Sequence, residues 1–481
     1  MKIKVLRSLK AKEGVLFAPV FSDATKVSLE NFPKEVKSFL ELVKKNEEFK
    51  GKKDQFAKTY IESKTLPEKL ILKGFGKIKN YTAARAREMG ALIGKVIADD
   101  KAREFSLYIL PEMDAHIVEL LEGLLSAQYK VDAHKSKKKK EVTKILNLIT
   151  GKNIAAQIKR AETVNRATGF VKNLVNWPAN IVDADYLAKE ARRIARKNNY
   201  KVAVFGNKEL KKMGWGLLLG VNQGTSREAR CLVLEYNGGK RNEKPIVLVG
   251  KGVIFDTGGY NLKPTNYIET MHQDMAGGAT VLGVFEVLKE LGIKKNVIGV
   301  IPAVENLIDG NAYRPSDILK SYSGKTVEVT NTDAEGRLIL ADAITYGVQF
   351  KPGALVTIAT LTGAVGVALG SRYAGILGNN VPLRNRIRKA GLKSGDLTWP
   401  LPLPNDYKKR LDSKVADLRN HDLGREAGSS LGAAFLERFV EGTHWCHIDI
   451  GGTAFTEKPK PTQTFGATAH GLKLLLNFLE S

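Results

Sequence analysis

Apolar runs and longer amphipathic segments alternate along the chain from Lys201 onward. The runs are rich in valine, isoleucine and leucine, and they predict strands at 201–205, 231–236, 245–250, 296–304, 326–330, 354–361 and 445–450. Nearly continuous apolar strands that are separated by helical segments are typical of a mostly parallel sheet covered on both faces. We therefore predict an α/β fold for this region, with a mostly parallel central sheet flanked by helices.

The first 150 residues follow a different pattern. Apolar stretches alternate there with lysine-rich helical segments, and residues 105–110 predict one buried strand. A long helical pattern then begins at Ile154 and extends to about Asn176. We predict a small N-terminal α/β domain at 1–150, with an oligomer-forming or accessory role, and a larger domain at 151–481 that carries the chemistry.

Composition adds one unusual feature, a formal net charge of +25 with a pI near 9.7. Such a charge attracts polyanions, of which nucleic acid is the most obvious. The basic residues are nevertheless spread along the whole chain, and the one dense run, Lys137–Lys140, is typical of a solvated loop. Nonspecific nucleic-acid binding is therefore an expectation for a secondary role.

The expected compartment is the cytoplasm. The two cysteines, Cys231 and Cys446, are too few for a disulfide framework, which favours a reducing environment. The N-terminus has no signal-peptide pattern, and no apolar run is long enough to span a bilayer. We expect no membrane association.

Three segments carry polar residues at the ends of predicted strands, where ligands bind in open α/β sheets. In the first segment, Lys251 directly follows a strand, Asp256 comes five residues later, and Lys263 lies beyond a Gly-Gly turn. A salt bridge at a strand end would explain any one of these residues alone. The Gly-Lys pair lacks the other residues of a phosphate-binding loop.

The second segment places Asp274 just before a helix that begins with small residues, where an ordinary helix cap is the simpler interpretation. In the third segment Asp333, Glu335 and Arg337 occupy alternate positions after a strand. A surface ion-pair cluster is the alternative for this set. The apolar residues on both sides instead favour a loop that emerges from the core.

The four carboxylates and the lysine of these segments are expected to converge. Carboxylates that meet in a protein interior need cations to neutralise them. Four anionic ligands suit two divalent ions, especially if Asp256 and Glu335 bridge them, and such a pair lowers the pKa of a bound water. No HExxH or GxSxG motif is present, and the histidines at 272, 421 and 447 lack ligand spacing.

These segments resemble a known family. NTDAEGRL at 331–338 is similar to the signature of the leucyl aminopeptidases, the M17-type cytosolic exopeptidases, and VGKGVIFDTGGYNLKP at 249–264 resembles their second hallmark. The resemblance extends from LVNWPAN at 174–180 to the C-terminus and includes ATLTGA at 359–364. The N-terminal domain resembles the family only in position and size.

The resemblance implies a metal-dependent exopeptidase that releases N-terminal residues, Leu-like and others, by attack of a metal-bridged water. It implies one ion on Asp256, Asp333 and Glu335. It implies a second ion on Lys251, Asp256, Asp274 and Glu335. The ions are expected to be manganese or zinc, with magnesium and cobalt as alternatives.

The resemblance also implies the remaining roles. Lys263 would stabilise the tetrahedral intermediate, and Arg337 would hold a bicarbonate ion as the general base. Substrate would contact Thr360, Leu361 and Gly363. Peptides with a free N-terminus are the expected partners, and a homohexamer is the expected assembly.

Three departures from the family pattern leave every ligand in place. Thr257 stands where serine is common, His272-Gln273 precedes Asp274, and Ala469-His470 replaces a more typical Gly-Arg. Two functions of other classes remain open at this stage. One is a DNA-binding protein that uses the basic surface, for which affinity would fall steeply with salt. The other is a two-metal hydrolase of phosphate esters.

Overall fold

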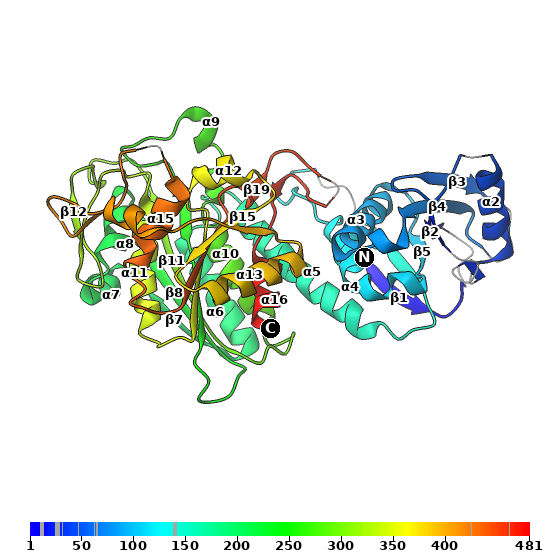
Figure 1. The fold of residues 1–481 in the computed structure, drawn as a ribbon, viewed down its shortest axis with the longest axis horizontal. Helices are drawn as coiled ribbons and strands as arrows, with labels where there is room; N and C mark the ends of the chain where they lie inside the picture. The colour runs from blue at the N-terminus through cyan, green and yellow to red at the C-terminus, as the bar shows by residue number, and fades with distance from the viewer. Residues whose placement is uncertain are drawn as a thin grey trace. The chain divides into compact units, whose positions relative to one another are not determined.

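The computed structural model describes the chain except residues 10–13, 25–28, 31, 47, 62, 64–65, 138–141, 425 and 461, so most of the lysine run at 137–140 lies outside the described residues. The described chain divides into two compact units (Figure 1). One unit contains residues 1–165 and 458–464, and the other contains 166–457 and 465–481. Each unit is described by itself.

The N-terminal unit is built on one six-stranded sheet in the order β1-β6-β5-β2-β4-β3. Neighbouring strands are parallel except β3, which pairs antiparallel with β4. The strands are β1 (Lys2–Leu6), β2 (Val15–Phe21), β3 (Phe56–Tyr60), β4 (Lys69–Gly76), β5 (Glu104–Tyr108) and β6 (Ile145–Ile149). The main helices are α2 (Lys34–Lys45), α3 (Ala83–Asp99) and α4 (Ile117–Ser126). The predicted small α/β domain is confirmed.

The C-terminal unit has a central nine-stranded sheet in the order β16-β15-β18-β14-β9-β11-β8-β7, with β10 paired to β11 outside this path. Pairs among β9, β11, β14 and β18 are parallel, whereas β7, β8 and β15 join antiparallel. The strands are β7 (Lys201–Phe205), β8 (Arg230–Asn237), β9 (Ile246–Gly250), β10 (Gly252–Asp256), β11 (Asn296–Asn306), β14 (Ala354–Ala359), β15 (Ala374–Gly378), β16 (Thr398–Pro400) and β18 (Trp445–Asp449). This confirms the predicted mostly parallel sheet.

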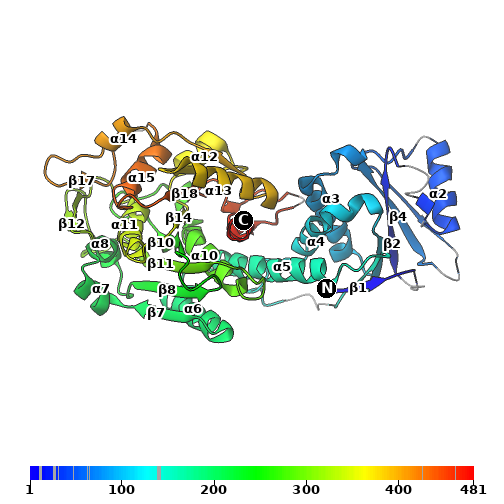
Figure 2. The same ribbon diagram turned by 60° about the horizontal axis from the view of Figure 1, so that its bottom comes forward.

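Helices cover both faces of this sheet (Figure 2). On one face α10 packs with α6 and α16, and on the other α11 packs with α8 and α15. The helices are α5 (Ala155–Asn176), α6 (Ala184–Asn198), α7 (Asn207–Met213), α8 (Gly216–Val221), α9 (Thr265–Ile268), α10 (Ala276–Val287), α11 (Glu335–Val348), α12 (Gly363–Leu369), α13 (Val381–Ser394), α14 (Asn405–Lys409), α15 (Gly428–Glu437) and α16 (Leu472–Leu479). In the part of the chain that the structure describes, no helix combines the length and the apolar character that a membrane crossing requires.

One predicted strand lies outside the central sheet. Residues 326–330 were expected to join it, but β13 (Thr326–Glu328) belongs to a separate three-stranded sheet with β12 (Ile318–Lys320) and β17 (Leu418–Arg419). The expectation was wrong because an apolar alternation predicts a strand but does not identify its partners. A further small sheet pairs β19 (Phe455–Thr456) with β20 (Gly466–Ala467).

Helix α11 is fixed in the core by a buried acid. Asp342 is fully buried, and its carboxylate accepts hydrogen bonds from the backbone N–H groups of Leu217 (3.1 Å), Leu218 (3.0 Å) and Tyr322 (2.7 Å). These amides belong to the start of α8 and to the turn after β12. One side chain of α11 therefore satisfies backbone donors from two other segments.

Candidate metal centre and active site

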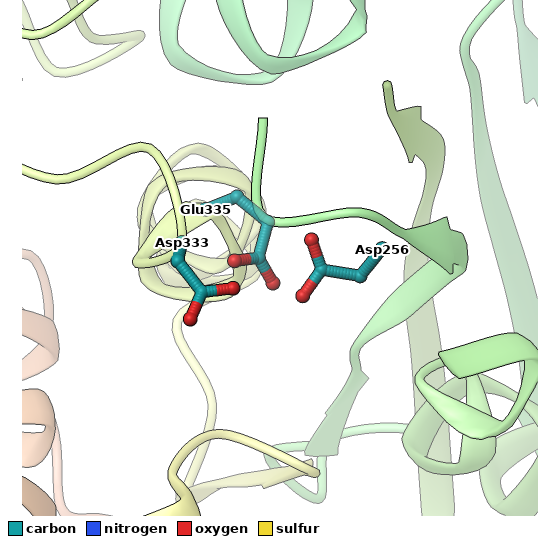
Figure 3. Close-up of side chains that lie close together, drawn as sticks. All are labelled: Asp256, Asp333 and Glu335. Atoms are coloured by element: carbon teal, nitrogen blue, oxygen red, sulfur yellow. The ribbon is translucent and has the colours of Figure 1, made fainter. Parts of the chain in front are cut away.

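Three carboxylates meet beyond the carboxyl ends of the central strands. Asp256 ends β10, Glu335 begins α11, and Asp333 lies in the loop just before that helix. One oxygen from each lies within 4.8 Å of the others (Figure 3). Asp256 and Glu335 are buried, whereas the side chain of Asp333 is 33% exposed. The structure thus brings Asp256 together with two acids that are far from it in the sequence.

Lys251 joins a fourth acid to this group. It follows β9 directly, and its Nζ lies 2.8 Å from Asp274 Oδ2 and 2.7 Å from Glu335 Oε1. The same ammonium donates a hydrogen bond of 3.0 Å to the carbonyl of Thr360. Lys251 and Asp274 are both buried. The lysine therefore connects the ends of β9 and β14 with the start of α11.

Lys263 contacts the other two acids. Its Nζ lies 2.8 Å from Asp256 Oδ2 and 2.5 Å from Asp333 Oδ1. A tight turn returns the chain to this position, since Gly258 has a φ of +86° and a β-carbon there would lie 2.5 Å from a backbone oxygen. The N–H of Lys263 closes the turn on the carbonyl of Thr257 at 2.9 Å. The predicted Gly-Gly turn thus places Lys263 beside the carboxylates.

Burial changes the pKa values of these acids. It raises the pKa of Asp256 and of Asp274, and it raises that of Asp333 to about 7, where the negative charge of Asp256 adds to the effect. Burial also acts on Glu335, but the two lysine ammonium groups outweigh it and hold the pKa of Glu335 below its ordinary value. The same carboxylates raise the pKa of both lysines against the opposing effect of burial.

The donor set fits divalent cations. Among the described residues, Asp274 Oδ2, Asp333 Oδ1 and Glu335 Oε1 are buried and have no hydrogen-bond partner, although a lysine nitrogen lies close to each. The carboxylates also outnumber the lysine ammonium groups by two. Buried oxygens with unused lone pairs and a surplus of negative charge are what a metal centre requires.

Arg337 lies in the first turn of α11, two residues after Glu335, and is 4% exposed. Its Nη1 donates to the carbonyl of Asn420 at 2.8 Å, and in the described part of the chain its Nε has no partner. Burial lowers the pKa of the guanidinium to about 10, with Glu335 and Asp449 acting in the opposite direction. A buried guanidinium with a free N–H is suited to binding a small anion.

The predicted substrate residues follow β14. The hydroxyl of Thr360 donates to Asp274 Oδ1 at 2.6 Å, and the N–H of Leu361 donates to Asp449 Oδ1 at 3.1 Å. Gly363 begins α12, and a β-carbon at this glycine would meet nothing within 4 Å. Thr360 therefore orients a carboxylate of the cluster, while Gly363 faces open space.

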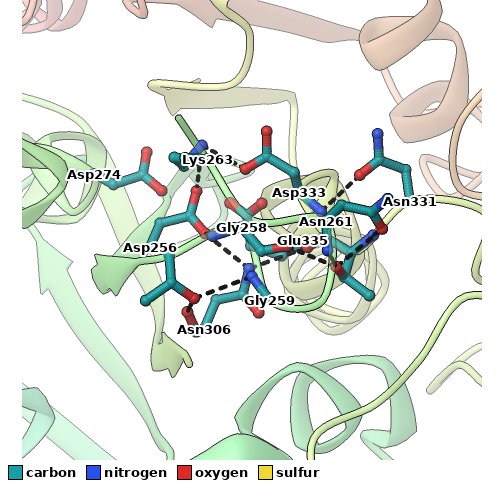
Figure 4. A network of polar contacts seen from close by, with 12 residues as sticks. Asp256, Gly258, Gly259, Asn261, Lys263, Asp274, Asn306, Asn331, Asp333 and Glu335 are labelled. Carbon is teal, nitrogen blue, oxygen red and sulfur yellow. Dashed lines mark hydrogen bonds and ion pairs between the residues drawn. The ribbon is translucent and has the colours of Figure 1, made fainter. Parts of the chain in front are cut away.

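The sequence interpretation missed two polar residues, Asn306 and Asp449. Asn306 ends β11, and its amide Nδ2 donates to Asp256 Oδ1 at 2.7 Å (Figure 4). Asp449 ends β18 and also accepts from the hydroxyl of Thr362 at 2.7 Å. Both residues follow apolar runs, so the strand-end criterion that selected Asp256 would have found them.

Histidines lie outside the carboxylate group. Within the described residues, the side chains close enough to share an ion are Asp256, Asp333 and Glu335. His447 is fully buried in the sheet, with its Nδ1 2.8 Å from the hydroxyl of Thr357. His272 packs edge-on against Phe455. The centre therefore differs from sites that are built on histidine ligands.

A close approach of α10 to the sheet supports the position of Lys251. A β-carbon on Gly277 would lie 2.1 Å from the carbonyl oxygen of Ile358 and 2.9 Å from the N–H nitrogen of Lys251. We predict that Gly277→Ala displaces Lys251 and destabilises the protein by about 1–3 kcal/mol. Because Lys251 contacts two acids of the centre, the catalytic activity of the centre should fall at least about tenfold. Gly169→Ala in α5 is the matched control, since its β-carbon meets nothing within 4 Å. Equal activity and equal thermal midpoints for the two variants would contradict the prediction.

Comparisons with known proteins agree with this geometry. Residues 169–476 match the Cytosol aminopeptidase family, catalytic domain, and residues 18–138 match its N-terminal domain. Proteins named probable cytosol aminopeptidase are similar along most of their length. That of Cenarchaeum symbiosum is 39% identical over 421 residues, covering 86% of each chain. That of Hamiltonella defensa is 40% identical over 459 residues, covering 92% of this chain and 90% of the relative.

A relative from Brucella melitensis, also named probable cytosol aminopeptidase, is 45% identical over 361 residues, which cover 73% of this chain and 74% of the relative. These matches confirm the resemblance that the sequence motifs indicated. They also extend the resemblance to the N-terminal domain, which contains none of the quoted motifs. The chain therefore belongs to the cytosol aminopeptidase family, a family of peptidases that act at the N-terminus of peptides.

Proposed function

We propose that the protein is a two-metal leucyl aminopeptidase that releases N-terminal residues, Leu-like and others, from peptides. The observation that carries the proposal is the convergence of Asp256, Asp333 and Glu335 within 4.8 Å, with Lys251 linking Asp274 to the same group. An isolated salt bridge or helix cap would not gather four acids from separate segments. Family membership supports peptides as the substrates.

The residues divide into two ligand sets. Asp256, Asp333 and Glu335 would hold one ion, and Lys251, Asp256, Asp274 and Glu335 the other, with manganese or zinc favoured over magnesium or cobalt. When bound, the ions would lower the pKa of the attacking water and polarise the scissile carbonyl. Lys251 has to release a proton before its Nζ serves as a ligand, because an ammonium nitrogen has no lone pair to offer a metal ion. In the absence of ions the neighbouring carboxylates raise the pKa of Lys251 against the opposing effect of burial.

Lys263 and Arg337 would carry the catalytic roles. The Lys263 ammonium, which stays protonated beside Asp256 and Asp333, would hold the negative charge that develops on the carbonyl oxygen. Arg337 would hold a bicarbonate ion, the general base of this proposal, through its unpaired Nε–H. Thr360, Leu361 and Gly363 would contact the substrate backbone and its first side chain.

Further parts of the proposal rest on the family and on composition. We propose a homohexamer in the cytoplasm, a domain division at 150/151, and an oligomer-forming or accessory role for the N-terminal domain. Cys231 and Cys446 are buried and form no disulfide, as a reducing compartment allows. Nonspecific nucleic-acid binding stays a prediction from the net charge of +25.

The test uses purified protein that is stripped of metal and then reloaded with manganese or zinc. We expect release of p-nitroaniline from leucyl-p-nitroanilide only after reloading, and none from the same substrate with an acetylated amine. p-Nitrophenyl phosphate is the control for a two-metal phosphate-ester hydrolase. Metal-dependent cleavage of the phosphate ester alone would replace the proposal by that alternative, and cleavage of the acetylated substrate would exclude an aminopeptidase.

A further inference from the structure

Asn306 is a buried amide that touches both acidic segments of the centre. It is the last residue of β11 and is completely buried. In the parallel pairing of β10 and β11 it is the register partner of Asp256. Its Nδ2 donates to Asp256 Oδ1 at 2.7 Å and to the carbonyl of Thr332 at 3.0 Å (Figure 4). One side chain thus connects β10 with the loop that carries Asp333.

These two bonds fix both neighbouring acids. Asp256 Oδ1 also accepts from the N–H of Gly258 at 2.9 Å, so two donors occupy this oxygen, while Oδ2 faces Lys263. The carbonyl of Thr332, directly before Asp333, also accepts from the hydroxyl of Tyr313 at 2.7 Å. Asn306 thus shares with Gly258 the orientation of Asp256, and with Tyr313 the position of the peptide carbonyl that precedes Asp333.

The orientation of the amide is determined by its neighbours. Both atoms near Nδ2 are acceptors, so the NH₂ group and not the oxygen has to face them. The amide oxygen of Asn306 is consequently buried without a partner among the described residues. An unpaired buried acceptor lowers stability. The unpaired oxygen therefore offsets part of the stability that the two donated hydrogen bonds supply.

We propose that Asn306 is a positioning residue that orients Asp256 and Asp333 for binding divalent ions. The inference rests on the proposed two-metal function. It assigns no contact between Asn306 and the ions or the substrate. Hydrogen bonds that orient metal ligands typically change metal affinity 10–100-fold when they are removed.

The test is calorimetric titration of Mn²⁺ into the metal-free full-length protein and its Asn306→Leu variant. Leucine has the branching of asparagine but no donor, so the space stays filled. We expect the Kd for Mn²⁺ to rise about 10–100-fold, while the thermal midpoint of the metal-free protein stays close to that of the wild type. An unchanged Kd would overturn the proposal.

Asn296→Leu is the matched control, because Asn296 begins the same strand and its buried amide also donates two hydrogen bonds, in this case to the carbonyls of Lys240 and Glu243 at 2.8 and 2.9 Å. It should leave the Kd for Mn²⁺ unchanged. Asn306→Ser, which is too short to reach Asp256, should weaken binding as Asn306→Leu does. Failure of both Asn306 variants to fold would favour a structural role and overturn the proposal. Failure of the wild type to bind Mn²⁺ would instead overturn the proposed metal function.

Discussion

Replacing Asp256 with alanine should lower kcat/KM for leucyl-p-nitroanilide by about 10³ or more, because this carboxylate belongs to both proposed ligand sets. The loss extends beyond one ligand. Asp256 Oδ2 is also a partner of Lys263 at 2.8 Å, and Asp256 Oδ1 is the acceptor for Asn306 and Gly258. Removing the acid leaves buried donors unpaired next to the reacting groups.

Steady-state kinetics at saturating Mn²⁺ would measure this effect, together with the metal content of the purified variant. Asp256→Asn separates the effect of charge from that of shape, since it keeps the side-chain volume but removes the negative charge. This variant should be nearly as inactive as Asp256→Ala. Glu162→Ala, an exposed acid on α5, is the control and should match the wild type. An Asp256→Ala protein with more than about a tenth of wild-type kcat/KM would contradict both ligand sets.

The largest expected effect on stability comes from Asp342→Ala. The substitution leaves the N–H groups of Leu217, Leu218 and Tyr322 buried without an acceptor. We expect a loss of about 3 kcal/mol, the scale of several unsatisfied buried donors after relaxation. Thermal unfolding of the metal-free protein would measure it, which separates the effect from any change in ion binding.

Thr345→Ala lies on the same helix and supplies the comparison. Its hydroxyl donates only to the carbonyl of Ala341 at 2.9 Å, an oxygen that α11 already uses. Its removal should cost less than about 1 kcal/mol. Equal thermal midpoints for the Asp342 and Thr345 variants would show that α8 and the turn near Tyr322 do not depend on the buried acid.

The strands of the central sheet were predictable where their apolar runs are long. Residues 246–250, 296–306 and 354–359 are buried along their whole length, and such runs have few alternatives in a globular protein. Strand partners were not predictable, as β13 shows. The sequence of a three-residue strand contains too little information to distinguish a central sheet from a small one.

The acids of the site were predictable because each follows a buried run or precedes a helix. Their distances were not, and neither was the second role of Thr360, whose hydroxyl binds Asp274. Asn306 was not predicted because a neutral amide at a strand end needs no cation to neutralise it, and so does not indicate a metal site as a buried carboxylate does. Its importance depends on the register between β10 and β11, which only the three-dimensional structure supplies.

The path of the chain through Lys251 has a mechanical consequence. The N–H of Lys251 still bonds to Ile358 of β14, but five residues later Asp256 is paired with β11 alone. The proposed ligands on either side of this point thus differ in their neighbours: Lys251 follows β9, which pairs with both β14 and β11, whereas Asp256 lies beside β11. Ions held by Lys251 and Asp256 together would link the end of β9, which pairs with β14, to the end of β10, which does not. Because ligands that bind only the native state stabilise it, binding of the ions should make local separation of these strands less favourable.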